Sequence, residues 1–253
     1  MNKIVIDKNK LIVYEDESIL CRGNQIVFKE NGDYTLEYVN SERIELEIIL
    51  LDQVFVKLFV LSQSLDIQSY HHYQLGKESN LVLFQFYHNR NVVEEKVIDL
   101  NGAYSKFYQG FSSISCGVEE YHIIVNHNHK NVRSDISNKC IGLDGSKVHF
   151  VIDSVLMKGN TDCVMDQNTR ILTLGDVDAQ IVPNMFTHED SVEAKHGSVI
   201  GGFSEDDIFY LMSRGISYHD AVMLLLKGFI FSNLVVDMEK RAMILNSIQD
   251  LRR

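Results

Sequence analysis

The sequence predicts a mainly β protein with a small α-helical region at its C-terminal end. From Met1 to about Ala194, short apolar stretches that suit β-strands recur roughly every 8–12 residues between polar turns. From Ser204 onward the apolar residues recur every three or four positions, as in amphipathic helices. The chain has a single proline, so few positions lack the amide that strand pairing needs. We therefore divide it into a β core, residues 1–203, and a helical region, residues 204–253.

Strand candidates follow one another along the β core. They include Ile4–Ile6, Leu11–Val13, Gln25–Phe28, Ile44–Leu50, Val54–Leu61 and Leu81–Tyr87. Alternate positions in two stretches are apolar, which predicts that these side chains face the core: Ile44, Leu46, Ile48 and Leu50, and later Val148, Phe150 and Ile152. An all-β sandwich, a barrel or a solenoid fits this spacing, and the pattern alone does not choose among them.

The first expected helix spans Glu205–Ser213. Ser204 is a suitable N-cap with Asp207 as its capping-box partner, and Gly215 is placed to end the helix in the left-handed conformation. The expected apolar stripe consists of Ile208, Leu211 and Met212.

Two further helices are expected. Ser217 begins the second, with Asp220 as its capping-box partner. Its packed face is expected to contain Ala221, Leu224 and Leu225. The third covers about residues 237–251, with Met238, Ala242, Leu245, Ile248 and Leu251 on one side.

Length and charge exclude several classes of function. The chain has 253 residues and a net charge of -11, which argues against a nucleic-acid partner, because such proteins need basic surfaces. No stretch approaches the ~20 apolar residues that span a bilayer, and the charged segment Met1–Lys10 does not suit a signal peptide. We therefore expect a cytoplasmic protein without membrane contact. Its four cysteines form no C-x-x-C pair and are expected to be reduced.

The most informative stretch is Val192–Ile216, which combines a His–Gly pair, a double glycine and signals for a helix start and stop. It resembles the C-terminal core of the SufB/SufD family of iron–sulfur cluster assembly proteins. The matching residues are Lys195-His196-Gly197, Gly201-Gly202, Ser204–Leu211 and Ser213–Ile216, and looser matches extend the resemblance to roughly Tyr121–Phe231. The resemblance implies a right-handed parallel β-helix, a solenoid whose ends need covers. Larger members carry a helical domain before the β-helix, and we expect that domain to be absent here.

The resemblance also implies a role for His196. In SufD-like relatives a His at this position helps to hold the nascent cluster, and neutral imidazole is a good ligand for iron. Relatives of the SufB type have a reactive Cys where this chain has Thr169, and a Thr cannot accept sulfur as a thiolate does. The chain is therefore expected to be of the SufD type. It departs from relatives at Ala194, where SufD-type chains often have Cys, and at Gly197, where SufB-type chains have Glu.

His196 is expected to lie on a late strand of the solenoid, Val192–Ile200, on the same face as Ala194. That face would look either into the core or toward a dimer seam. We favour the seam, because Ala194 and Gly197 leave room for a second chain. The alternative is a turn histidine that bonds a backbone carbonyl.

The function that the resemblance implies is that of a non-enzymatic scaffold or structural subunit of a SUF-type assembly complex, holding an iron–sulfur cluster transiently at an interface. The expected partners are a SufC-like ABC ATPase, a SufB-like subunit or a second copy of the chain, and indirectly a cysteine desulfurase system. The second helix has more apolar residues than one packed face needs. We predict that Leu224, Leu225 and Phe229 bind the ATPase, since contiguous apolar surface usually marks an interface.

Other cysteines and histidines leave alternatives open. Cys163 is a candidate metal ligand and stand-in sulfur acceptor, or a buried core thiol. Cys116, Cys140 and Cys163 are spaced by 24 and 23 residues, so they would stack if each spacing were one coil. His127 and His129 alternate and would share one strand face, as an exposed metal-binding pair or as plain polar surface.

A second class of function rests on residues 187–190. His188, Glu189 and Asp190, together with His196, would form a metal site if the loop brings them together. The chain would then be a metal-dependent or carbohydrate-active β-helix enzyme. It has no phosphate-binding loop of the G-x-x-x-x-G-K-[ST] type, so we do not expect it to be an ATPase itself.

Overall fold

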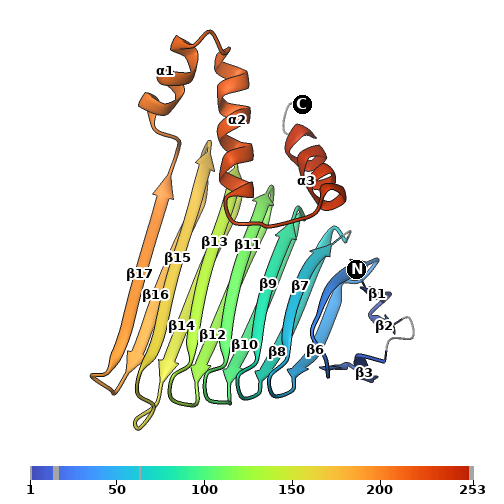
Figure 1. Ribbon diagram of the computed structural model, residues 1–253. Helices are drawn as coiled ribbons and strands as arrows, with labels where there is room; N and C mark the ends of the chain where they lie inside the picture. The colour runs from blue at the N-terminus through green and yellow to red at the C-terminus, as the bar shows by residue number, and fades with distance from the viewer. Residues whose placement is uncertain (1, 14–16, 63, 251–253) are drawn as a thin grey trace.

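A computed structural model describes residues 2–13, 17–62 and 64–250 (Figure 1). The strands are β1 (Asn2–Asp7), β2 (Lys10–Val13), β3 (Ile19–Arg22), β4 (Gln25–Phe28), β5 (Gly32–Val39), β6 (Arg43–Leu50), β7 (Phe55–Ser62), β8 (Asp66–Leu75), β9 (Asn80–Tyr87), β10 (Asn91–Leu100), β11 (Lys106–Ser115), β12 (Val118–His127), β13 (Arg133–Leu143), β14 (Lys147–Leu156), β15 (Cys163–Leu174), β16 (Asp178–Thr187) and β17 (Val192–Gly201). The helices are α1 (Glu205–Ser213), α2 (Tyr218–Phe231) and α3 (Met238–Asp250). Strands therefore precede helices, as the change of period predicts.

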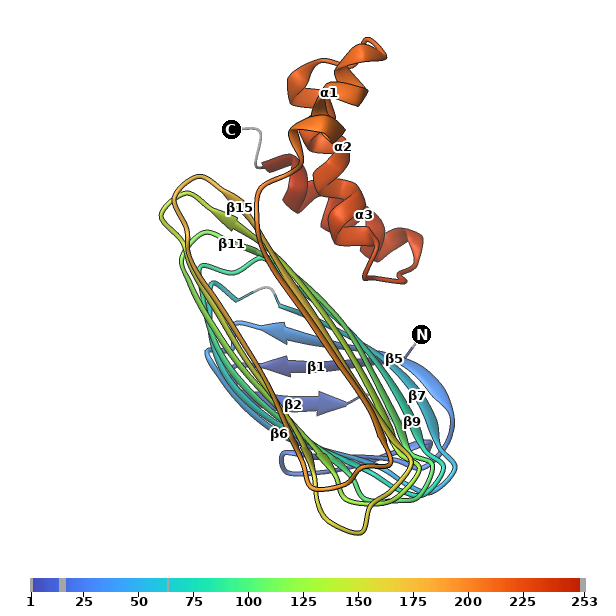
Figure 2. The same cartoon turned by 90° about the vertical axis from the view of Figure 1, so that its left-hand side faces the viewer.

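The strands form two sheets that face each other. Sheet A has the order β17-β15-β13-β11-β9-β7-β5-β1-β2, and sheet B has the order β16-β14-β12-β10-β8-β6-β4-β3. From β6 onward, each strand pairs in parallel with the strand two places before it, so the chain alternates between the sheets. Seen along the axis, the coils superimpose as a flattened ring (Figure 2). The prediction of a parallel β-solenoid is confirmed, and the alternatives of a sandwich or a barrel are excluded.

One backbone conformation, with a positive φ, recurs at the corners of the coils. Gln53, Glu78, Tyr104, Asn131 and Asp162 each have a positive φ, between 56° and 63°. At four of them the backbone amide donates to the corner of the following coil, for example Gln53 to the Lys77 carbonyl at 2.7 Å and Asn131 to the Thr161 carbonyl at 3.0 Å. Stacked corners thus satisfy each other's backbone groups, which a buried or half-buried turn requires.

The alternation predicted from the sequence sets the interior of the solenoid. Ile44, Leu46, Ile48 and Leu50 are all buried, and so are Val148, Phe150 and Ile152. They belong to one apolar cluster that runs the length of the coils. A second cluster lies outside the ring, between the outer face of sheet A and the helices.

Helix α1 has the predicted bounds but not the predicted packing. The Ser204 hydroxyl accepts from the Asp206 amide at 3.2 Å, so the residue is an N-cap, although it bonds Asp206 instead of Asp207. Gly215 has a φ of +85°, and its amide donates to the Met212 carbonyl, which confirms the expected helix stop. No side chain of α1 is buried. The expected apolar stripe therefore covers no core within this chain.

Helix α2 begins as predicted, with the Ser217 hydroxyl accepting from the Asp220 amide at 3.1 Å. Its packed face differs from the expected one, because Leu224 is 51% exposed and Leu225 is only partly buried. The buried residues are Ala221, Met223, Leu226, Phe229 and Ile230. Most residues of α2 after Ala221 are apolar, so its sequence does not mark one face above another.

Two cations of sheet A lie beneath the C-terminal half of α2. Lys139 Nζ is 5.4 Å and the Arg170 guanidinium 5.6 Å from the centre of the Phe229 ring, which suits a cation–π contact. Burial, and to a lesser degree the neighbouring Arg170, lower the pKa of Lys139. The last turn of α2 has no basic residue of its own. The solenoid therefore provides the positive charge that a helix C-terminus favours.

The segment after α2 lies against the outer face of sheet A. Asn233 Nδ2 donates to the carbonyl oxygens of Phe111 at 2.6 Å and Ser137 at 2.7 Å. Gly110 permits this approach, because a Cβ there would lie 2.2 Å from the Asn233 carbonyl oxygen. These contacts fix the end of α2 on the solenoid.

The predicted face of α3 is wrong. Met238 is 82% exposed and Ala242 is exposed, whereas Ile244 and Ile248 are fully buried against sheet A. Of the predicted stripe only Ile248 is buried, and Leu251 lies outside the described residues. None of the helices in the described part of the chain is long and apolar enough to cross a membrane.

Candidate functional site

The solenoid has an open end at its last coil. Strands β16 and β17 are the outermost strands of sheets B and A, so each has one unpaired edge (Figure 1). Most of β17 is exposed, and Phe186, Val199 and Ile200 are 52%, 52% and 47% exposed. Long edges with apolar side chains pair readily with another chain. Helices α2 and α3 do not cover this end, because they pack on the outer face of sheet A, and α1 lies beyond the ends of the strands (Figure 1).

His196 lies on the inward-facing row of this last strand. In the ladder between β15 and β17, Gln167 pairs with His196 and Thr169 pairs with Ser198. Gln167 and Thr169 face the interior and are 1% and 2% exposed. His196 continues their row but is exposed, because no further coil follows. Within the described residues, its imidazole has no hydrogen bond or ion pair, so both ring nitrogens are available to a ligand or a second chain.

The backbone beside His196 leaves space. A Cβ on Gly197 would meet no atom closer than 3.9 Å, the side chain of Asn168. A Cβ on Gly201 would meet nothing within 4 Å. Neither glycine is needed for packing inside this chain. Their lack of side chains keeps the surface beside His196 flat and open to close approach.

Behind the open end, the interior row is polar. Asn138 Nδ2 donates to the Thr169 hydroxyl at 3.0 Å, and Gln109 Nε2 donates to Asn138 Oδ1 at 2.8 Å. Gln109 in turn accepts from Lys96 Nζ at 3.1 Å. This row of polar groups leads from Thr169 toward the middle of the solenoid.

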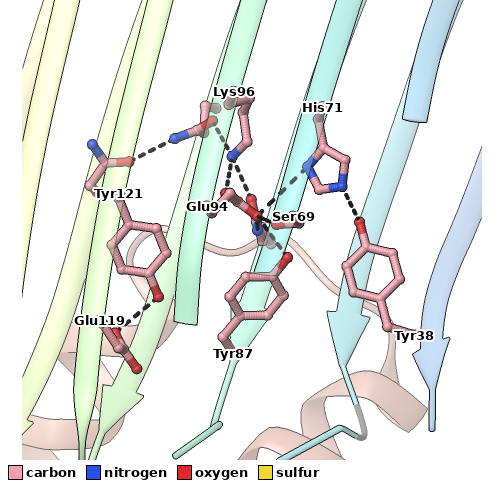
Figure 3. A network of polar contacts seen from close by, with 11 residues as sticks. Tyr38, Ser69, His71, Tyr87, Glu94, Lys96, Glu119 and Tyr121 are labelled. Atoms are coloured by element: carbon pink, nitrogen blue, oxygen red, sulfur yellow. Dashed lines mark hydrogen bonds and ion pairs between the residues drawn. The ribbon is translucent and has the colours of Figure 1, made fainter. Parts of the chain in front are cut away.

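The row ends in a buried ionic cluster (Figure 3). Lys96 Nζ lies 2.9 Å from Glu94 Oε1, and Glu94 Oε2 accepts from the Tyr87 hydroxyl at 2.9 Å. His71 lies beside this carboxylate, and its Nε2 is 2.9 Å from the Tyr38 hydroxyl. All five side chains are at most 2% exposed. Buried charges of opposite sign with this many hydrogen bonds compensate each other's desolvation.

The ionic cluster sets its own protonation states. Burial raises the pKa of Glu94, but Lys96 and His71 together lower it by more. The net pKa of this carboxyl therefore lies below its usual range. Burial lowers the pKa of His71 to about 4, although Glu94 opposes this shift. At neutral pH the Glu94 carboxyl is therefore ionised and the His71 imidazole is neutral.

A second interior carboxyl, Glu119, forms no ion pair with any residue that the structure describes. Glu119 Oε2 accepts from the Ser113 hydroxyl at 2.8 Å and the Tyr121 hydroxyl at 3.0 Å, and Cys140 Sγ lies 3.6 Å away. Burial raises the pKa of Glu119 to about 7 and raises that of Cys140 well above its ordinary value. Cys140 is therefore a protonated, buried thiol and not a nucleophile.

The cysteines do not form the stack that their spacing suggested. Cys140 pairs with Ile171, and Cys163 pairs with Val192 at the other end of β15. Cys116 lies exposed in the turn after β11. Cys163 is 1% exposed, its Sγ faces backbone carbonyls, and burial raises its pKa. Cys140 pairs with Ser113, 27 residues before it, and with Ile171, 31 residues after it, so the cysteine spacings of 24 and 23 are shorter than either coil.

The expected histidine pair is also wrong. His127 is the last residue of β12 and is fully buried, with Nε2 2.9 Å from the Ser134 hydroxyl. Burial lowers its pKa to about 4. His129 lies in the following turn, where the alternation of a strand no longer applies. Among the residues that the structure describes, no three His, Cys, Asp or Glu side chains are grouped to hold a metal, so His188, Glu189, Asp190 and His196 do not form the alternative site.

The residues expected to bind the ATPase separate into two groups. Phe229 is 7% exposed and packs against sheet A, whereas Leu224 is half exposed on the free side of α2. Helix α1 and the first half of α2 extend beyond the ends of the strands (Figure 1). Large exposed side chains gather there, and sequence reasoning missed most of them: Phe209 (72%), Tyr210 (58%), Met212 (45%) and Tyr218 (61%). The hairpin of α1 and α2 therefore presents an apolar surface that the chain itself leaves uncovered.

Comparison with known proteins agrees with this geometry. Residues 55–229 match the family model described as SUF system FeS cluster assembly, SufBD core domain. An iron–sulfur cluster assembly SufBD family protein of Archaeoglobus fulgidus is 31% identical over 103 residues, which are 40% of this chain and 27% of that protein. A protein of the same description from Staphylococcus saprophyticus is 32% identical over 110 residues, 41% of this chain and 23% of the relative.

These alignments cover about a quarter of each relative's length. The family model covers more than two thirds of this chain, from β7 into α2, and so includes the open end and most of the interior row. The chain therefore belongs to the SufBD family of iron–sulfur cluster assembly proteins.

Proposed function

We propose that this chain is a non-enzymatic scaffold subunit in iron–sulfur cluster assembly, and that the open end of its solenoid is the seam to a second subunit. The observation that carries the proposal is the position of His196, which continues a buried row yet is exposed on an edge strand. A second chain placed against β16 and β17 would bury that row. The partner is a SufB-like subunit or a second copy of this chain.

The cluster is cargo in this proposal, held at the seam while it is built. His196 would supply an imidazole ligand to iron. Thr169 has no thiol, and its hydroxyl already accepts from Asn138, so Thr169 does not accept sulfur, and groups of the partner or Cys163 would do so. Cys163 stays a prediction as a sulfur acceptor, and its use would require the corner around it to open. SufD-like rather than SufB-like character follows from the same absence of a thiol at Thr169.

The hairpin of α1 and α2 is the proposed docking surface for a SufC-like ABC ATPase. Leu224 and, partly, Leu225 are available there together with Phe209 and Tyr210. Phe229 would support this surface from beneath, by fixing α2 on the solenoid. Burial of aromatic side chains from such a surface provides much of the free energy of association in many interfaces.

Two measurements on the expressed protein test the proposal. Pull-down from the native host should retain an ABC ATPase, and light scattering should give twice the mass of the chain, or the mass of a complex with a SufB-like subunit. Phe209→Asp with Tyr210→Asp should remove the ATPase and leave the dimer. A monomer that retains no ATPase, from a host in which both partners are expressed, would refute the scaffold role.

A further inference from the structure

The last buried layer of the interior contains an acceptor without a donor. Gln167, on β15, is 1% exposed. Its Nε2 donates to the Ser154 hydroxyl at 2.7 Å and to the Asn184 carbonyl at 3.2 Å. Its Oε1 is buried, and no group in the described part of the chain donates a hydrogen bond to it. A buried acceptor that lacks a donor lowers stability, so this oxygen is expected to gain a donor in the working protein.

The surroundings of this amide fix its orientation. Two of the acceptors around Nε2 are backbone carbonyl oxygens, of Asn184 at 3.2 Å and of Ile152 at 3.5 Å. A carbonyl oxygen only accepts, so an exchange of the amide oxygen and nitrogen would bring oxygen against oxygen. Ile152 and Asn184 belong to β14 and β16 of sheet B. The nitrogen of Gln167 therefore faces sheet B, and the group that remains without a partner is an acceptor.

The inward side chains next to Gln167 on sheet A include one suitable donor. Gln167 lies between Ile136 on β13 and His196 on β17, and neighbouring strands are about 4.8 Å apart. Along β15 its inward neighbours are Met165 and Thr169. Ile136 and Met165 have no N–H or O–H in their side chains, and the Thr169 hydroxyl makes no hydrogen bond with Oε1. The donor that remains in this group is the imidazole N–H of His196.

We propose that Gln167 is a positioning residue for His196: in the assembled seam, one ring N–H of His196 donates to Gln167 Oε1. The inference rests on the proposed function, in which His196 is a ligand to iron. A neutral imidazole has one N–H and one nitrogen with a free lone pair. The bond to Gln167 would fix which nitrogen has the proton and leave the other free for iron. Histidine ligands commonly donate their second ring N–H to such a neighbouring group.

The two groups lack a protein partner for complementary reasons. His196 is exposed in the isolated chain, so water can bond both of its ring nitrogens. A second chain against β17 would exclude this water, and the ring N–H would then need an acceptor inside the seam. Gln167 Oε1 is the acceptor without a donor in the same row. Assembly would thus satisfy both groups with one hydrogen bond.

Nuclear magnetic resonance of the ring nitrogens tests the bond directly. In a chain with ¹⁵N-labelled histidines, a spectrum of the His196→Ala variant identifies the His196 signals among the ten histidines. His196 should exchange between two tautomers in the isolated chain and show a single tautomer in the iron-free complex with its partner. Gln167→Leu should restore the exchange in that complex. Gln109→Leu, which removes an equally buried glutamine two coils back, should keep the single tautomer.

Iron binding separates this inference from the proposed function. In anaerobic titration of the complex with Fe²⁺, Gln167→Leu should weaken binding about 10-fold or more, and His196→Ala should weaken it further. Exchange between tautomers in the wild-type complex, or a single tautomer in the Gln167→Leu complex, overturns the role of Gln167. Loss of iron in His196→Ala but full affinity in Gln167→Leu also overturns it, although the ligand role of His196 would stand. Full affinity in His196→Ala would refute the ligand role itself, and this inference with it.

Discussion

His196 pairs with Gln167 across the last ladder of sheet A, yet Gln167 is buried and His196 is exposed. These two residues lie in one inward-facing row. Their environments differ only because β17 is the last strand of sheet A, so no further coil covers His196. In a coil farther back, the same position would bury an imidazole. At the open end it becomes a group that a second chain would cover, and the proposed seam rests on this relationship.

Gly197→Leu separates folding from association. The site has no atom within 3.9 Å of an added Cβ, so the isolated chain should melt within a few degrees of wild type. A leucine beside His196 should obstruct a second chain and shift the protein from dimer or heterodimer to monomer. Differential scanning calorimetry and light scattering measure the two effects. Retained association at wild-type affinity would place the seam elsewhere.

Leu224→Asp should mainly weaken ATPase binding, whereas Phe229→Ala should mainly lower the stability of the docked helices. Leu224 is half exposed, so Leu224→Asp should change the free energy of unfolding by less than about 1 kcal/mol but weaken ATPase retention. Phe229 is buried against sheet A, so Phe229→Ala should destabilise the docked helices by roughly 3 kcal/mol. Urea unfolding and pull-down measure both. Full ATPase retention by Leu224→Asp would exclude this side of α2.

Glu119→Gln should change how stability depends on pH. The folded pKa of Glu119 is about 7 against an ordinary 4.5, so the unfolded chain releases its proton first as pH rises. In the wild type, protonated Glu119 contributes fully to the free energy of unfolding below pH 4.5. This contribution, about 3 kcal/mol, is lost as the pH rises to 7. The variant keeps an acceptor for Ser113 and does not titrate. Urea unfolding at pH 5 and pH 8 should show that the stability of Glu119→Gln relative to wild type grows with pH. Glu120→Gln, at the neighbouring half-exposed carboxyl, should show no such growth.

The sequence predicted the fold well where periodicity alone decides it. Alternation located the inward side chains of β6 and β14, and Ser204, Gly215 and Ser217 marked helix ends by local chemistry. The faces of α2 and α3 were not predictable in the same way. Apolar residues surround most of α2, and tertiary contact with sheet A selects the buried side. The amino-acid sequence of α2 alone therefore does not indicate which side of the helix is buried.

The interior charges were missed for a related reason. Glu94 and Lys96 occupy inward positions of β10, where a period of two predicts that charged residues face solvent. They are buried because they pair with each other, with Gln85 on the facing strand β9 and with Gln109 of the next coil. These partners lie on other strands, and only the packing of the two sheets brings them together. His127 was misplaced by the same limit, whereas the strand containing His196 was located correctly from its motif.

His196→Ala measures the central claim most directly. Two quantities should be recorded on the variant: the melting temperature, and the iron and sulfide bound after anaerobic reconstitution with the partner present. His129→Ala, a partly exposed turn histidine, is the matched control and should change neither. The account predicts an unchanged melt with loss of bound cluster for His196→Ala. A lowered melting temperature with the cluster retained would contradict it, since His196 would then support the fold and not the seam.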